Sequence, residues 1–322
     1  MTRRGWLLFV AMGLIWGTPY LMIKVAVDEV SPPMVVFVRC VFGAIVLLPV
    51  VVHRKQLASL RGRWWWLIAF AVTEIVGPWL LLSDAERTLS SGTTGLFIAT
   101  VPVIGVVLAW IAGDRGVTPA RWAGLLLGFG GVALLAAPTV ESSGAWPATE
   151  MLLVAIGYAA APLIADRALR DVPGLVVTAT CLAFASLVYA PAAAWTWPDS
   201  LPSGRALLAL AGLATVCTAL AFVLFFELIK EVGAARATVI TYVNPAIAVA
   251  LGAAVLGEPL TLSVGAAFAL ILVGSVLATR GGGAISESVS PAPVSPEPLP
   301  ETPGDSPSGT PDRPHDRYTA TR

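Results

Sequence analysis

Few residues of this chain could do chemistry, and the most conspicuous of them lie inside long apolar stretches. Arg39 and Glu74 each occupy such a stretch, where an isolated charge costs about 3 kcal/mol on membrane-insertion scales. Arg39 stays protonated at physiological pH and could bind a carboxylate or phosphate. Glu74 precedes Pro78 by four residues, so the proline ring frees the carbonyl of Glu74 itself. We expect the two residues to form the polar centre of this region, either as a substrate or proton site or as a structural clamp.

A second group of candidates follows one face of the first apolar stretch. Gly13, Trp16, Gly17, Tyr20 and Lys24 are spaced so that one helix face carries all five. This face could line a transport pathway, or it could be a packing face from which Lys24 reaches to the membrane surface. The complete set of predicted substrate-pathway residues is Trp16, Gly17, Tyr20, Arg39, Glu74, Pro102, Tyr158, Tyr242 and Pro245.

The chain carries no pattern typical of an enzyme, a metal site or a cofactor site. Its two histidines, His53 and His315, are far apart in the sequence, and Cys40, Cys181 and Cys217 lack metal-ligand spacing. It has neither a nucleophile elbow nor a phosphate-binding loop. The formal net charge is zero, which argues against a nucleic-acid partner. We therefore predict no catalytic residues, no metal and no cofactor.

The composition places these candidates in a membrane protein. Hydrophobic residues make up 57% of the chain and charged residues 12%, against about 25% charge in a soluble domain. Runs of about 20 apolar residues are long enough to cross a bilayer as helices. Ten such runs are predicted, at residues 6–26, 33–52, 64–82, 92–112, 119–138, 149–168, 175–195, 207–229, 235–256 and 262–279.

The apolar part of the chain repeats itself at an offset of 143 residues. Pro19 aligns with Pro162 in this way, and Pro102 aligns with Pro245. Each proline removes a helical hydrogen bond, so these four positions should be kinks that face protein or a cavity. Two halves of five helices each must have opposite orientations in the membrane. We predict an all-α membrane protein of ten transmembrane helices, built as two inverted five-helix repeats at residues 1–138 and 139–280.

The basic residues predict the orientation. With the N-terminus in the cytoplasm, thirteen Lys and Arg residues fall on the cytoplasmic side and three on the outer side. Both termini are then cytoplasmic. Residues 281–322 contain nine prolines and almost no large apolar residues, so we predict a disordered, Pro-rich cytoplasmic tail. A Pro-rich ligand for a partner domain is the alternative interpretation of this tail.

Several motifs resemble those of EamA-type transporters of the drug/metabolite transporter superfamily. In the second half these are residues 226–237, the sequence Tyr-Val-Asn-Pro at 242–245, and Leu-Gly-Glu-Pro-Leu at 256–260. In the first half the sequence Ile-Trp-Gly-Thr-Pro-Tyr at 15–20 resembles the opening of the repeat. The resemblance covers residues 6–280. The chain departs from the family pattern at Asp114, where Glu is usual, and at 159–160, where the aromatic-Gly pair is missing.

The resemblance implies a secondary transporter that moves a small organic metabolite, such as an amino acid or a drug-like compound, by alternating access. It implies a multi-pass protein of the cytoplasmic membrane and favours export. A membrane-embedded enzyme acting on lipid-linked substrates and a non-transporting scaffold or sensor are the alternatives. The expected partners are the substrate and the bilayer. The sequence leaves proton coupling, counter-substrate exchange and a homodimer open, and it does not name the substrate.

Overall fold

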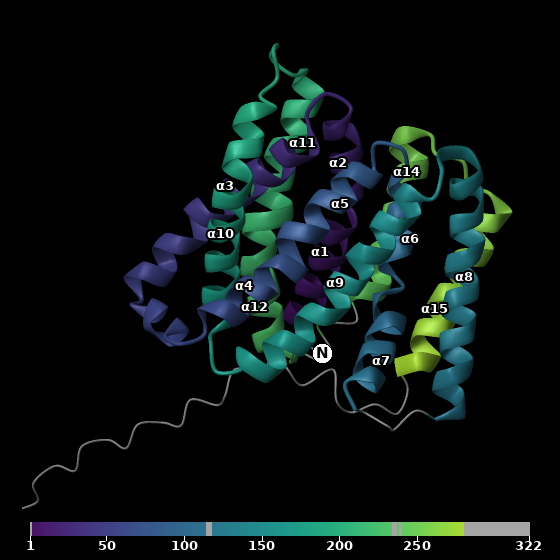
Figure 1. The fold of residues 1–322 in the computed structure, drawn as a ribbon, viewed down its shortest axis with the longest axis horizontal. Coiled ribbons are helices and arrows are strands. Elements are labelled where there is room, and N and C mark those ends of the chain that lie inside the picture. The colour runs from purple at the N-terminus through teal and green to yellow at the C-terminus, as the bar shows by residue number, and fades with distance from the viewer. Residues whose placement is uncertain (1, 114–117, 234–236, 238–239, 280–322) are drawn as a thin grey trace, which may run out of the picture. The chain divides into compact units, whose positions relative to one another are not determined.

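The computed structural model describes residues 2–113, 118–233, 237 and 240–279, and all the regular elements among them are helical (Figure 1). Eight helical segments are long and apolar enough to cross a membrane, and two shorter apolar helices follow them. Each predicted apolar run overlaps one of these segments. Residue 114 and the predicted tail, 281–322, lie outside the described residues.

The helices fall into two consecutive sets. The first set consists of α1 (Arg3–Gly17), α2 (Pro19–Val27), α3 (Pro32–His53), η1 (Gln56–Leu60), α4 (Trp64–Ala71), η2 (Val72–Val76), α5 (Gly77–Ala85), α6 (Ser91–Ile98), α7 (Val101–Ile111) and α8 (Pro119–Ser143). The second consists of α9 (Trp146–Ala168), α10 (Gly174–Trp195), α11 (Gly204–Ala214), η3 (Thr215–Leu220), α12 (Ala221–Val232), α14 (Ile240–Leu256) and α15 (Leu262–Thr279).

Local sequence signals explain where several helices begin. Ser31 and Thr118 are N-cap residues whose side chains accept a hydrogen bond from the amide three residues later, and a proline follows each. A hydroxyl at this position satisfies one of the free amides of the first turn, and proline is preorganised for the first helical position. Ser90 and Ser203 cap α6 and α11 in the same way.

The four repeat-related prolines do not act alike. Pro19 and Pro102 lie at the starts of α2 and α7, directly after breaks in the helical path. Pro162 and Pro245 instead lie inside the uninterrupted helices α9 and α14. The four positions are therefore not equivalent, because the first-half prolines follow helix breaks and the second-half prolines lie within continuous helices, where kinks stay a prediction.

Side chains donate hydrogen bonds to carbonyl groups beside both breaks. At the first break, the hydroxyl of Thr18 donates to the carbonyl of Ile15 at 2.8 Å. At the second, Thr100 donates to the carbonyl of Phe97 at 2.6 Å, and Ser275 of α15 donates to that of Ala99 at 2.9 Å. Backbone groups in a membrane must find partners inside the protein. These contacts explain how irregular backbone persists at both positions.

Two membrane-crossing segments contain a short π-helix. The first, η2, includes Glu74 and ends just before Pro78. The second, η3, includes Thr218, whose hydroxyl donates to the carbonyl of Leu213, five residues earlier, at 2.8 Å. π-Helical turns are rare and frequently occur at functional sites. The helix irregularity expected near Glu74 is thus a π-helical turn. No proline follows the equivalent π-helical turn η3 in the second half, so the sequence did not indicate it.

Pairs of repeat-equivalent helices make close contacts. The helices α3 and α10 pack together, and so do α8 and α15 (Figure 1). The fourth membrane-crossing segment consists of α6 and α7, and it contacts its repeat equivalent α14 through α6. At the α8–α15 crossing, a Cβ atom added to Gly274 would lie 2.4 Å from the main-chain nitrogen of Gly128. Only glycine permits this approach of two backbones.

Candidate functional site

The first-helix face divides into packing residues and one residue that points inward. Trp16 packs against Phe222 and Phe225 of α12, with ring centroids 6.1 and 4.7 Å away. A Cβ added to Gly17 would lie 2.4 Å from Cγ2 of Ile247 on α14. The structure therefore places Trp16 and Gly17 in helix–helix contacts.

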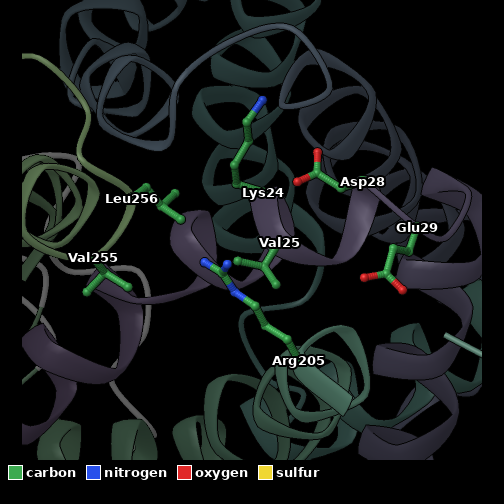
Figure 2. A pocket seen from close by; sticks show the side chains of 7 residues that line it. All are labelled: Lys24, Val25, Asp28, Glu29, Arg205, Val255 and Leu256. Carbon is green, nitrogen blue, oxygen red and sulfur yellow. The ribbon is translucent and has the colours of Figure 1, made fainter. Parts of the chain in front are cut away.

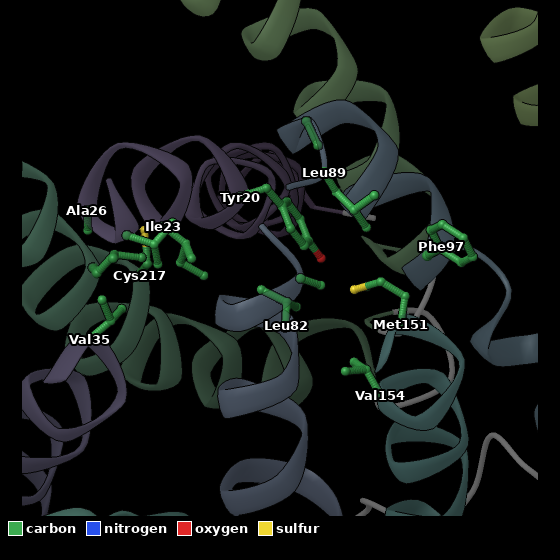
Figure 3. Packing of buried hydrophobic residues seen from close by; sticks show 14 of the residues in the cluster. Tyr20, Ile23, Ala26, Val35, Leu82, Leu89, Phe97, Met151, Val154 and Cys217 are labelled. Atoms are coloured by element: carbon green, nitrogen blue, oxygen red, sulfur yellow. The ribbon is translucent and has the colours of Figure 1, made fainter. Parts of the chain in front are cut away.

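Tyr20, one turn after Trp16, belongs instead to a buried cluster that joins the two halves. Its side chain is 8% exposed, and its hydroxyl points toward the space between Leu82 and Met151 (Figure 3). Leu82 comes from α5 and Met151 from α9. A buried tyrosine hydroxyl normally needs a polar partner. The charged residues that act electrostatically on Tyr20 are Glu86 and Arg39.

Arg39 contacts residues of both halves of the chain. Its guanidinium carbon is 3.8 Å from the ring centroid of Trp79, and its Nε donates to the hydroxyl of Thr218 at 3.4 Å. The residue is 6% exposed. Cation–π contacts reach about 2 kcal/mol when they are desolvated. Arg39 of α3 is thus held between α5 of its own half and the π-helical turn η3 of the other.

The expected pair between Arg39 and Glu74 is absent from the described structure. The buried acid Glu86 acts electrostatically on Arg39, whereas Glu74 is not among the groups that do so in the described structure. Glu74 is half-buried in η2 and lies close enough to Tyr158 to affect its hydroxyl. The sequence could not reveal this, because a π-helical turn changes which face of the helix a side chain occupies.

Tyr158 connects the separate polar groups. Its hydroxyl lies within electrostatic range of Glu74, Tyr20 and Arg39 and close to the indole of Trp79. Its ring packs against both of the large buried clusters. We call Tyr20, Arg39, Glu74, Glu86 and Tyr158 the polar layer. Four of its residues come from the first half and one from the second.

The remaining predicted residues lie around this layer. Pro245 is buried in α14, and it and Tyr20 both approach Gly95 of α6. Tyr242 is half-buried three residues earlier in the same helix. Pro102 begins α7 and is half-buried. Of these three, Pro245 is the one that the described contacts bring next to the layer.

Sequence reasoning missed Glu86 and Glu258. Glu86 has no exposed surface, and neither of its carboxylate oxygens accepts a hydrogen bond from the described residues. Glu258 accepts hydrogen bonds from the amides of Ser91 and Gly92 at 2.7 and 2.9 Å, at the first turn of α6. A carboxylate is favourable at a helix N-terminus. Glu86 follows a Ser-Asp-Ala sequence that reads as a polar loop, so composition gave no signal for it.

A depression of about 290 Å³ opens beside the C-terminal end of α2 (Figure 2). Its charged lining residues are Lys24, Asp28, Glu29 and Arg205. The amide of Ser203 donates to Glu29 at 2.6 Å, and its hydroxyl donates to the other carboxylate oxygen. These bonds hold the pKa of Glu29 below its ordinary value. The depression therefore presents both signs of charge to a small molecule. In the described residues no three His, Cys, Asp or Glu side chains gather as metal ligands.

Comparisons with known proteins agree with this architecture. A solved structure with 21% sequence identity superposes with a TM-score of 0.61 over 87% of this chain and 97% of its own, which shows a shared fold. The uncharacterized inner membrane transporter YedA of Escherichia coli K12 is 28% identical over 274 residues, covering 84% of this chain and 89% of YedA. The uncharacterized transporter YvbV of Bacillus subtilis is 24% identical over 272 residues, covering 83% and 88%.

The family assignment rests on both halves of the chain. The model of the EamA-like transporter family matches residues 3–137 and matches again at residues 146–280. The two matches together span most of the sequence. The apolar helices and the transporter relatives make this a multi-pass membrane protein. The chain belongs to the EamA-like transporter family.

Proposed function

We propose that the protein is a secondary transporter that exports a small organic metabolite across the cytoplasmic membrane by alternating access. The observation that carries this proposal is the polar layer. Charged and hydroxyl groups from both halves are gathered inside a bundle of apolar helices. Ionisable groups in such a position are costly and are typical of substrate and ion pathways. The family relationship supports the general activity, and the direction of transport is part of the proposal.

We further propose that the two halves, 1–138 and 139–280, are inverted five-helix repeats. The helix contacts support this relation. The first membrane-crossing segment contacts the eighth, through α2 and α11. Their repeat equivalents, the sixth and the third segments, also contact each other, through α9 and α5. Contact of the first with the ninth, through α1 and α14, is matched by α9 with α7. Exchanging each helix for its repeat equivalent thus preserves these contacts, as a twofold axis in the membrane plane requires.

Both termini are cytoplasmic in this proposal, so the depression at Lys24 opens to the outside. The asymmetry of basic residues supports this orientation. Reporter fusions at Ser142 and after Arg280 should report opposite sides of the membrane. Two reporters on the same side would contradict the proposed number of crossings.

Transport itself is tested with the purified full-length protein in liposomes. A library of metabolites is screened for uptake and efflux, with and without a pH gradient. Amino acids are the first compounds to test, because the depression offers both signs of charge. Flux above that of empty liposomes is expected for at least one compound. Absence of flux for the complete library would count against transport.

If the protein were a scaffold or sensor that acts through residues 281–322, its function would depend on that segment. Ending the chain after Gly283 removes most of that segment and leaves all the described helices intact. We expect the truncated protein to keep its substrate flux. Loss of flux with normal membrane insertion would favour a role for the tail.

A further inference from the structure

Glu86 is a buried acid for which the fold provides no hydrogen-bond donor. It follows the last residue of α5 directly and has 0% exposure. Both carboxylate oxygens are buried, and none of the described residues donates to them. An ionised carboxylate without water or donors is strongly disfavoured, and such a group instead takes up a proton. In this arrangement the neutral acid is the compatible form.

Lys24 connects Glu86 with the surface. Its ammonium group donates to the main-chain carbonyl of Glu86 at 2.6 Å and lies 3.4 Å from that of Arg87. The same Lys24 side chain lines the depression of about 290 Å³ (Figure 2). Lys24 therefore joins the wall of the charged depression to the main chain of Glu86.

The charges that face Glu86 come from three directions. Lys24 on α2 and Arg39 on α3 favour its ionised form, and Glu258, after α14, opposes it. Tyr20 of α2 also lies within electrostatic range. Arg39 and Glu258 are already engaged, with Trp79 and Thr218 and with the first turn of α6, respectively. Burial is the largest influence and raises the pKa of Glu86 well above its ordinary value.

We propose that Glu86 is the proton-binding site through which this transporter is coupled to the proton gradient. The inference rests on the transport function proposed above. A proton from the outer depression adds to the Glu86 carboxylate and gives the neutral acid, which can remain buried as it is here. Release of that proton recreates a carboxylate, which requires water or a cation and so favours an arrangement in which the segment around Glu86 has opened. Proton binding and conformation are thereby linked.

The first experiment reads the carboxyl group directly and needs no substrate. Infrared spectra of the full-length protein in liposomes are recorded as the pH is raised from neutral to alkaline and returned. The wild type should show a protonated-carboxyl band that decreases reversibly, and this decrease should be smaller by one carboxyl group in Glu86→Gln, in which Glu74 and Glu150 remain. Asp171→Asn is the control, because Asp171 is exposed at the surface and pairs with Arg63. It should show the same decrease as the wild type. Identical spectra for wild type and Glu86→Gln would overturn the proposal.

Thermal unfolding gives an independent readout with a defined sign. Because the pKa of Glu86 is raised in the folded protein, its contribution to stability is complete at acidic pH and is lost as pH rises toward the folded value. Glu86→Gln cannot lose a proton. Its melting temperature should therefore rise relative to wild type as the pH increases. A constant difference between the two proteins over the pH range would contradict the proposal.

The second experiment tests coupling, with a mixture of radiolabelled amino acids as the probe. For one proton exchanged per substrate, a gradient of one pH unit supports at most about tenfold accumulation. Wild type and Asp171→Asn should accumulate the probe, whereas Glu86→Gln should only equilibrate it, near onefold, while still exchanging labelled for unlabelled probe. Gradient-driven accumulation by Glu86→Gln would overturn the proposal. If the wild type moves no probe, the transport of amino acids fails, and the infrared result still decides whether Glu86 binds a proton.

Discussion

The two halves of the chain share a scaffold but differ in their buried charges. At the repeat offset of 143 residues, Arg39 corresponds to Leu182 and Glu74 to Cys217. Glu86 corresponds to Ile229. All three counterparts are buried apolar or weakly polar residues. Equivalent helices therefore pack alike while the charged chemistry is concentrated in the first half, so the duplication supplies the framework and one half supplies most of the polar layer.

The largest effect on transport is expected when Arg39 is replaced by leucine, the residue at the equivalent position 182 of the second half. Arg39→Leu removes the stacking on Trp79 and the hydrogen bond to Thr218, and with them the cation of the polar layer. Transport should fall by about 100-fold, equivalent to about 2.7 kcal/mol. Flux into liposomes measures this. Leu182→Met is the matched control and should keep near-normal flux, since a volume-conserving swap in an apolar core is tolerated. Equal losses in the two variants would erase the proposed difference between the halves.

The second prediction concerns the part of the scaffold that the halves share. Gly131 and Gly274 are repeat equivalents, and added Cβ atoms would lie 2.7 Å from Cγ1 of Ile271 and 2.4 Å from the Gly128 nitrogen, respectively. Overpacking typically costs about 1–3 kcal/mol. Both alanine variants should unfold at lower temperature than wild type, Gly274→Ala more so because a main chain yields less than a side chain. Gly130→Ala, with open space around it, should not lose stability. A neutral Gly274→Ala would contradict the close crossing.

A smaller effect is expected where the second half supports the first π-helical turn. The hydroxyl of Tyr189 on α10 donates to the carbonyl of Val76 in η2. Tyr189→Phe leaves that carbonyl without this donor, and the loss should be about 1 kcal/mol. Thermal unfolding in detergent measures it, and Ser186→Ala is a control because that hydroxyl donates to the carbonyl of Ala183 in its own helix. Equal stability of Tyr189→Phe and wild type would show that η2 does not depend on this contact.

The smallest expected quantity is the coupling between Arg39 and Glu74. Because the described structure contains no ion pair between them, Arg39→Ala and Glu74→Ala should have additive effects on stability, within about 0.5 kcal/mol. A double-mutant cycle measures the coupling. Partial recovery in the double variant would instead indicate that the two charges interact and would restore the pair that the sequence suggested.

The sequence predicted those features that depend on local pattern. The apolar runs located the helices, because about 20 apolar residues satisfy both the bilayer and the backbone. Pro19 and Pro102 indicated real breaks. Arg39 and Tyr20 lie within these runs and both are buried, while their part in a substrate pathway stays a prediction.

Features that depend on tertiary contact could not be read in this way. The partners of Arg39 are Trp79 and Thr218, which lie 40 and 179 residues away in the sequence. Nothing local distinguishes Thr218 from any other threonine in an apolar run, and η3 lacks the proline that follows η2. Glu86 reads as a loop residue because its burial comes entirely from neighbouring segments.

The two π-helical turns also record the history of the chain. They begin at Val72 and Thr215, which are 143 residues apart. Each π-helical turn accommodates more residues than an α-helical turn. A π-helical turn already present in the five-helix unit before it duplicated would account for both turns at equivalent positions. The differences between Arg39 and Leu182 and between Glu86 and Ile229 arose after that copying. In this chronology the deformed helices are older than the division of charge between the halves.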